Sequence, residues 1–336
     1  MSHPRCIALA GFDSRRGSSL SERLFRWQPA PRLLRLDGGG EAADDAEESE
    51  SLLIDWSEPD SDEALCDAFA KCSVDMLVHM GSPGFPMPFE EADPEFELRR
   101  IRVLLKAAER SSLKRLVMGS STLLYGAMPD NPNFLTESHP LRGHPHANWM
   151  EARIQAEQSV QEFAQRHPQT EVTVLRSCWS LGPGVSSPVS RFFSEASVPT
   201  CLGYDPLLQF IHEEDLLSVF EKAIGESHPG TFNIVARGVL PLSTLLALAG
   251  KTRWPLPVMM LDRWPGSWPW GSSSGAPSTF YDFLRYLWVA AGESGWSEFG
   301  EPGYTSREAW ISFVSSERLN DYRRGGKSSS GSGAER

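Results

Sequence analysis

The chain has 336 residues, 40% of them hydrophobic, which is enough to bury a sizeable core in one large domain or two closely joined ones. The net charge of −12 and the pI near 5.2 argue against broad binding to nucleic acid or to an anionic membrane surface. No apolar run approaches the roughly 20 residues that a membrane span requires.

The first half of the chain alternates short apolar runs with helical patterns. The predicted strands are 6–10, 32–36, 52–54, 76–79, 115–118 and 171–175, and the predicted helices are 18–26, 62–70, 96–110 and 147–166. This alternation predicts an α/β fold with a doubly wound parallel sheet of the Rossmann type.

The second half is less regular and rich in Pro and Gly. A short strand at 209–211 leads into a predicted helix at 213–224, followed by a strand at 231–234 and a helix at 242–249. Thr305 and Glu308 have the spacing of a capping box that opens a last helix towards Glu317. We therefore expect a Rossmann-type domain over residues 1–175, to which segments around 205–235 return. Residues 176–320 form mainly a smaller C-terminal α/β lobe, and the Ser- and Gly-rich residues 321–336 form a disordered tail.

Several motifs in chain order match those of one enzyme family. They are Gly119-Ser120-Ser121-Thr122-Leu123-Leu124-Tyr125-Gly126, Thr136-Glu137, Pro140-Leu141, Glu157, Leu175-Arg176 with Gly182-Pro183-Gly184, and Phe210-Ile211-His212 with Asp215. On these motifs, over roughly residues 5 to 315, the chain resembles the extended short-chain dehydrogenase/reductases, the NAD-dependent epimerase/dehydratase family. The resemblance implies a bound NAD or NADP and a nucleotide-sugar substrate.

The family's Tyr-x-x-x-Lys helix is present in outline, but Trp149 stands for the tyrosine and Arg153 for the lysine. Four residues make about one helical turn, so both side chains are expected to face the cofactor cleft. In the family the phenol exchanges a proton, and the ammonium lowers the pKa of the phenol and binds the nicotinamide ribose. An indole N–H only donates, and arginine stays charged. Ser121 matches the family's catalytic Ser or Thr and is retained.

The first turn resembles the family's Gly-x-x-Gly-x-x-Gly loop, which brings backbone close to the pyrophosphate of a dinucleotide. Gly11 and Gly17 match, but Ser14 replaces the middle glycine, and its Cβ would push the diphosphate away unless the loop shifts. Arg15 and Arg16 would compensate as anion ligands at the helix N-terminus.

Four further residues lie at positions where the family contacts its cofactor. Asp37 ends the second strand, where an acid favours NAD by binding a ribose hydroxyl, whereas Arg15 would favour the 2′-phosphate of NADP. Asp55 matches an acid near the adenine, and Met80 and Gly81 match a run along the cofactor. Asp37 before three glycines is also typical of a turn, and the others also fit a purely structural role. The choice between NAD and NADP therefore stays open.

Five departures from the family pattern gather around one cleft: Ser14, Glu97, Arg100, Trp149 and Arg153. We therefore expect a protein impaired in the usual Tyr/Lys chemistry, which keeps the fold to bind a dinucleotide or a partner. The alternative is an active NAD(P)-dependent oxidoreductase or epimerase with a different proton relay.

That alternative relay would use His146, or a water held by Ser121 and Arg153. His139 and His144 lie in the same loop, and solvent-facing histidines are the simpler interpretation of all three. Since no Cys or carboxylate spacing completes a ligand set there, we expect no metal site.

The segment 254–270 is rich in Pro and contains Trp254, Trp264, Trp268 and Trp270. Such a segment either packs over the small lobe or exposes an aromatic surface to a protein partner or hydrophobic ligand. The family resemblance also implies a homodimer through helices 96–110 and 147–166.

Cysteine usage and charge patterning indicate where the protein works. The five cysteines contain no Cys-x-x-Cys pair and follow no signal peptide, so we expect reduced thiols in the cytoplasm. Six acidic residues between 41 and 50 indicate a solvated loop. The alternative is a docking site for a basic partner.

Overall fold

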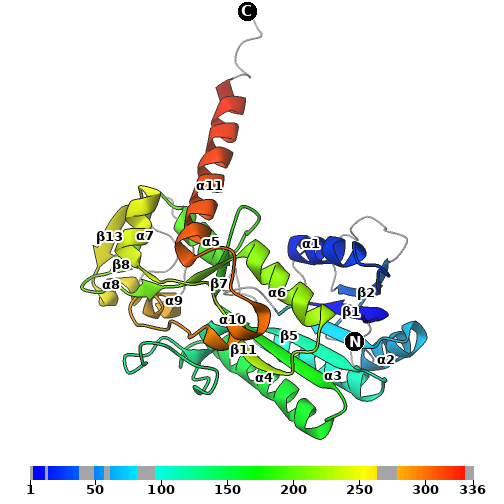
Figure 1. Cartoon of the computed structure of the whole chain (residues 1–336). Coiled ribbons are helices and arrows are strands. Elements are labelled where there is room, and N and C mark those ends of the chain that lie inside the picture. Colours follow the sequence, from blue (N-terminus) through cyan, green and yellow to red (C-terminus); the bar gives the residue numbers. More distant parts are fainter. Residues whose placement is uncertain are drawn as a thin grey trace, which may run out of the picture.

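The central feature of the computed structural model is a seven-stranded parallel sheet (Figure 1). The structure describes residues 3–11, 14–37, 49–56, 61–81, 95–262 and 278–329. The strands are β1 (Cys6–Ala10), β2 (Arg32–Asp37), β3 (Ser49–Leu53), β4 (Met76–His79), β5 (Arg115–Ser121), β6 (Glu171–Ser177) and β11 (Gly230–Ile234). Their order is β11-β6-β5-β4-β1-β2-β3, and every neighbouring pair is parallel. The predicted doubly wound sheet is confirmed.

Helices cover both faces of this sheet because its side chains alternate between two apolar cores. On β1, Ile7 and Leu9 join one core, and Cys6, Ala8 and Ala10 join the other. The first core includes α1 (Ser14–Phe25) and α6 (Glu213–Gly225). The second includes α2 (Ser61–Cys72), α3 (Phe96–Glu109) and much of α4 (Asn148–Arg166). Helices α3 and α4 lie side by side (Figure 1).

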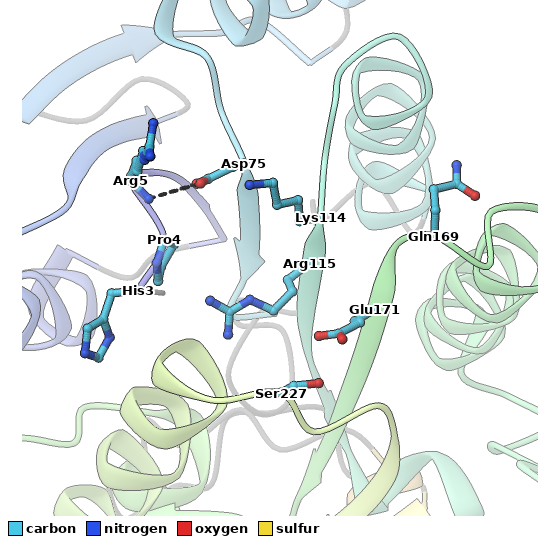
Figure 2. Close-up of a pocket in the computed structure, with 9 residues that line it drawn as sticks. All are labelled: His3, Pro4, Arg5, Asp75, Lys114, Arg115, Gln169, Glu171 and Ser227. Atoms are coloured by element: carbon cyan, nitrogen blue, oxygen red, sulfur yellow. Dashed lines mark hydrogen bonds between the residues drawn. The ribbon is translucent and has the colours of Figure 1, made fainter. Parts of the chain in front are cut away.

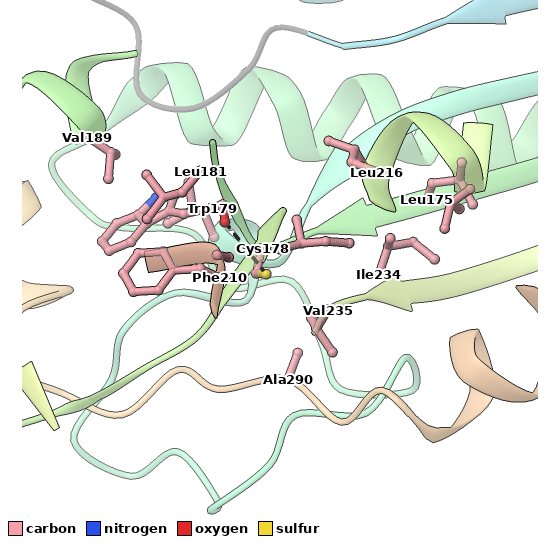
Figure 3. Close-up of a cluster of buried hydrophobic side chains, with 14 of the residues drawn as sticks. Leu175, Cys178, Trp179, Leu181, Val189, Phe210, Leu216, Ile234, Val235 and Ala290 are labelled. Carbon is pink, nitrogen blue, oxygen red and sulfur yellow. Dashed lines mark hydrogen bonds between the residues drawn. The ribbon is translucent and has the colours of Figure 1, made fainter. Parts of the chain in front are cut away.

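The second half of the chain builds a lobe from short elements. They are β7 (Trp179–Leu181), α5 (Pro188–Ser194), β8 (Ser197–Cys201), β9 (Leu207–Leu208), β10 (Phe210–His212), β12 (Leu240–Pro241), α7 (Leu242–Ala249), β13 (Thr252–Leu256), α8 (Val258–Asp262), α9 (Ser278–Asp282), α10 (Glu293–Phe299) and α11 (Ser306–Ser329). The strands pair two by two, as β10 with β7, β12 with β9, and β13 with β8. Trp179 is buried in the lobe core beside Phe210 (Figure 3) and also contacts Phe193 and Trp288. Aromatic packing therefore supplies much of the cohesion that such short strands cannot.

Predicted and observed elements of the first half agree within a few residues, with one consequential difference. Helix α1 begins at Ser14 and not at residue 18, so the loop residues from Ser14 to Gly17 belong to its first turns. The predicted boundaries at 1–175 and 176–320 remain a prediction, although β11 does return to the main sheet.

The last helix is longer than the sequence predicts. Thr305 and Glu308 form the predicted capping box, with Thr305 N donating to Glu308 Oε2 at 2.8 Å and Glu308 N donating to Thr305 Oγ1 at 3.3 Å. The helix continues past Glu317 to Ser329, projecting beyond the body (Figure 1), and the disordered tail over 321–336 remains a prediction. Glu, Arg and Leu are good helix formers, and no Pro or Gly interrupts the chain before Gly325.

Some predicted features lie outside the described residues. They are the acidic stretch 41–48, Trp264, Trp268, Trp270 and residues 330–336. Within the part of the chain that the structure describes, no helix has the length and apolarity to cross a membrane.

Candidate functional site

The carboxyl edge of the sheet brings the predicted cofactor residues after β1 and β4 together. Gly11 has φ +79°, and a Cβ there would lie 2.6 Å from the ring of His79. Gly81 has φ +70°, and its Cβ would lie 2.4 Å from the carbonyl oxygen of Gly119. Met80 N donates to Ala10 O at 2.9 Å, which ties the two strand ends together. Glycine is required here by both conformation and space.

The first turn of α1 lies at the same edge of the sheet. Ser14 and Arg15 open the helix, and Gly17 is buried within it. Because α1 follows β1 directly, its free backbone N–H groups face the carboxyl edge, as phosphate sites do. Asp37 is the last residue of β2, and Asp55 is exposed just after β3. The side chains of Ser14, Arg15 and Asp37 lie outside the described part of the structure.

Ser121, which matches the family's catalytic Ser or Thr, ends β5 and caps a short 3-10 helix, η1 (Thr122–Tyr125). Its hydroxyl accepts from Leu123 N at 3.2 Å and donates to Ser177 O at 3.2 Å. Ser121 therefore sits at the carboxyl edge, with its hydroxyl engaged by the backbone.

Trp149 and Arg153 lie one turn apart in the first turns of α4, as predicted from their spacing. The guanidinium carbon of Arg153 is 5.0 Å from the centre of a Trp149 ring, a cation–π contact. Both residues are half-buried. The two replacements for the family's Tyr and Lys therefore contact each other.

The departures on α3 join the same region. Glu97 Oε1 and His79 Nε2 form a hydrogen bond of 2.6 Å, and Arg100 donates to the other carboxylate oxygen of Glu97. The exposed fractions are 1% for His79, 8% for Glu97 and 9% for Arg100, so these are buried polar contacts. We call His79, Glu97, Arg100, Trp149 and Arg153 the cleft cluster.

Electrostatics tie Arg153 to this cluster. Burial alone would raise the pKa of Glu97, but His79, Arg100 and Arg153 outweigh it and hold that pKa well below its usual range. Burial lowers the pKa of Arg153, and the charge of Glu97 opposes that shift. The carboxylate of Glu97 is therefore the shared counter-charge of two arginines from adjacent helices. In the sequence, Glu97 and Arg100 are recognisable only as departures from the family pattern. The contact between Glu97 and His79 could not be predicted from it.

A second set of polar side chains is joined by hydrogen bonds. We call this set, which consists of Ser120, Tyr125, Glu157, Arg176 and Asn233, the buried network. Arg176 Nε donates to Glu157 Oε1 at 3.0 Å, and Arg176 Nη1 donates to the Tyr125 hydroxyl at 2.8 Å. Tyr125 donates in turn to Asn233 Oδ1 at 2.8 Å, and Ser120 donates to Glu157. The network joins β5, η1, β6, α4 and β11, and all its members lie in segments that resemble the family.

Tyr125 does not replace the missing catalytic phenol. It is fully buried, and its hydroxyl is bonded on both sides within the network. Burial raises the pKa of Tyr125, against the influence of Arg176. A phenol held in this way cannot reach a substrate and exchange a proton with it.

Two of the loop histidines, His144 and His146, have separate roles. His144 Nε2 lies 2.9 Å from Asp282 Oδ2 on α9, and His144 Nδ1 accepts from His146 N at 3.2 Å. His144 therefore anchors the loop to the lobe, whereas His146 is exposed close to the start of α4. No group of His, Cys, Asp or Glu among the described residues could hold a metal ion.

The carboxyl edge of the sheet has, at one end, backbone features that a dinucleotide site uses. Gly11 and Gly81 have positive φ and bring the ends of β1 and β4 against His79 and Gly119, and α1 begins three residues after Gly11. At the other end, the indole of Trp149 supplies no exchangeable proton and the guanidinium of Arg153 is stacked and charge-paired. The arrangement can bind and orient, but it lacks the usual acid/base.

Residues 10–235 match the NAD dependent epimerase/dehydratase family. Uncharacterized proteins of Mycobacterium bovis and Mycobacterium tuberculosis are 31% identical over 187 residues, which is 55% of this chain and 50% of theirs. The chain thus spans about half the length of the curated relatives it matches.

Solved structures resemble the chain over nearly its whole length. The dTDP-glucose 4,6-dehydratase of Bacillus anthracis in complex with NAD has a TM-score of 0.67 and 16% identity, covering 95% of this chain and 98% of that one. The UDP-glucose 4-epimerase of Thermotoga maritima, solved with UDP-glucose, has a TM-score of 0.67 and 15% identity, covering 94% and 99%. At such identities the likeness is one of fold.

Proposed function

The chain belongs to the NAD dependent epimerase/dehydratase family, and on that premise we propose that it binds NAD without performing the family's Tyr/Lys chemistry. In this proposal it acts as a dinucleotide-binding protein that responds to its ligand or presents a surface to a partner. Bound NAD would supply hydride transfer, while Trp149 and Arg153, at the positions of the family's Tyr and Lys, cannot carry the accompanying proton.

The observation that carries this proposal is the mutual contact of the residues that depart from the family. Glu97 bonds His79 and Arg100, and Arg153 stacks on Trp149 while sharing the charge of Glu97. Substitutions that merely followed a loss of function would be expected to leave buried charges without a partner, which lowers the stability of the fold. In the cleft cluster the charges of Glu97, Arg100 and Arg153 compensate one another, which supports a role other than the family's usual chemistry.

Cofactor binding is the first test, by calorimetric titration of NAD⁺, NADH, NADP⁺ and NADPH. We expect NAD to bind, and Gly11→Ala to abolish that binding, because its Cβ would meet the His79 ring at 2.6 Å. Gly238→Ala is the matched control, since Gly238 has the same φ of +79° with nothing within 4 Å. Absence of binding to all four nucleotides would refute the proposal.

Turnover is the second test, with a nucleotide sugar as substrate and product analysis as readout. We expect no turnover from the native protein. We expect a measurable gain only when Trp149→Tyr and Arg153→Lys are combined with Glu97→Asn and Arg100→Gly, the residues common in the family at those positions. Glu97 contacts Arg100, Trp149 contacts Arg153, and the charge of Glu97 also acts on Arg153. Losing a general acid/base typically costs about 10²–10⁴-fold, so native turnover within that factor of an active relative would favour the enzyme alternative. His146→Ala would then decide whether His146 carries the proton.

Three further expectations belong to this proposal: a cytoplasmic protein, a homodimer through α3 and α4, and a protein partner at the segment that begins with Trp254. Light scattering tests the second, and a monomer at micromolar concentration would contradict it. Trp254 is 41% exposed, which supports the third.

A further inference from the structure

A separate pocket opens at the opposite, amino edge of the sheet (Figure 2). Its cavity volume is about 490 Å³, within the range that takes a small organic ligand. Charged side chains dominate its lining: Arg5, Asp75, Lys114, Arg115 and Glu171.

The pocket is remote from the carboxyl-edge crevice. Arg115 opens β5 and Ser121 closes it, and six steps of ~3.3 Å separate the two residues by roughly 20 Å. A ligand in this pocket would therefore not overlap a dinucleotide at Gly11 and Gly81.

The backbone holds the charged residues in place. Lys114 N donates to Asp75 O at 2.9 Å, and Glu171 N donates to Lys114 O at 2.8 Å. Arg115 Nη1 donates to Glu226 O at 3.0 Å, which steadies the guanidinium. A charged pocket fixed by main-chain bonds needs little reorganisation to bind.

The balance of hydrogen-bonding groups favours an anion. The carboxylate of Asp75 already accepts from the backbone N–H groups of Arg5 and Cys6, each at 3.1 Å. Lys114 and Arg115 are adjacent cations, and burial lowers the pKa of Arg115 although Glu171 opposes it. A partly desolvated guanidinium gains from a bound anion, and two adjacent cations match the charge of a phosphate.

The opposite side of the pocket is suited to hydroxyl groups. Glu171 offers an acceptor and Ser227 a hydroxyl, both on the far side of Arg115 from Lys114 and Asp75 (Figure 2). We propose that the amino-edge pocket binds a phosphate ester of a hydroxylated small molecule, with Lys114 and Arg115 holding the phosphate and Glu171 accepting from a hydroxyl.

Calorimetry on the full chain tests this, with glycerol 3-phosphate, inorganic phosphate and glycerol as probes. We expect glycerol 3-phosphate to bind, inorganic phosphate to bind more weakly, and glycerol not to bind. Lys114→Gln and Arg115→Gln should each weaken the ester by about tenfold, the loss of one charge-assisted contact. Lys114 is exposed, so its variant remains decisive if Arg115→Gln fails to fold.

The matched control is Arg237→Gln, which removes an exposed cation paired with Glu301, outside the pocket lining. It should leave the affinity for the ester unchanged. The proposal is overturned if glycerol 3-phosphate does not bind, or if Lys114→Gln binds it as tightly as the native chain. Equal affinity for inorganic phosphate would overturn the role given to Glu171.

Discussion

The buried network and the cleft cluster each combine glutamate with arginine, yet they differ in origin. Glu157 and Arg176 of the network are 0% and 4% exposed and belong to motifs shared with the family. Glu97 and Arg100 of the cleft cluster are 8% and 9% exposed and depart from the family pattern. By the resemblance, the polar contacts that join strands and helices follow the family pattern, whereas those at the predicted cofactor site depart from it. Fold and chemistry therefore depend on different residues, even where those residues are neighbours.

The largest expected effect on stability comes from a substitution in the buried network. Glu157→Gln leaves the buried guanidinium of Arg176 without its counter-charge, so we expect a loss of about 3–5 kcal/mol in the free energy of unfolding. Urea denaturation measures it. Arg166→Gln, which removes an exposed partner of Glu109, is the control and should cost less than about 1 kcal/mol. Equal losses in the two variants would erase the distinction between buried and surface pairs.

A smaller loss is expected in the cleft cluster. Glu97→Gln removes the counter-charge shared by Arg100 and Arg153, but these groups are closer to solvent, so we expect roughly 2 kcal/mol. A stability equal to that of the native chain would mean that the rebuilt cleft is not held by its charges.

The same variant has a predictable dependence on pH. Because the pKa of Glu97 is held below its ordinary value of 4.5, the ionised form stabilises the fold, and that contribution is complete above pH 4.5. It is lost as the pH falls further, towards the folded-state pKa. The stability difference between the native chain and Glu97→Gln should therefore be constant from about pH 8 to 6 and shrink below about pH 4.5. A difference that grew on acidification would reverse the assigned sign.

The smallest effect concerns the contact between Trp149 and Arg153. A double-mutant cycle with Trp149→Leu and Arg153→Met should give a coupling free energy of about 0.5–1 kcal/mol, the usual size of a cation–π contact near the surface. A coupling of zero would show that the two replacements act separately.

The fold could be predicted from the sequence wherever elements were long and periodic. Strands β1 and β4 and helix α7 were predicted to the residue, and α3 and α4 to within one. Strands such as β7 and β8 were missed, because three to five residues in a Pro- and Gly-rich context carry no usable period.

The candidate site was predictable in part. The spacing of Trp149 and Arg153 was enough to place them one turn apart. The contact of Glu97 with His79 was not, because it spans 18 residues and arises only from the sheet order and the first turn of α3. The contact of Asn233 with Tyr125 was not predictable for the same reason, since it spans 108 residues.

Trp149 also provides a fluorescence signal from the cleft cluster. Indole emission responds to nearby charge and polarity, and this ring lies half-buried against the guanidinium of Arg153 in the first turns of α4. Trp179, Trp288 and Trp310, by contrast, are enclosed in the lobe and shielded from any ligand. The difference in emission between the native chain and Trp149→Phe therefore isolates a signal from the cleft alone. The substitution that removes a proton carrier thus installs a native fluorophore at the position where occupancy would be read.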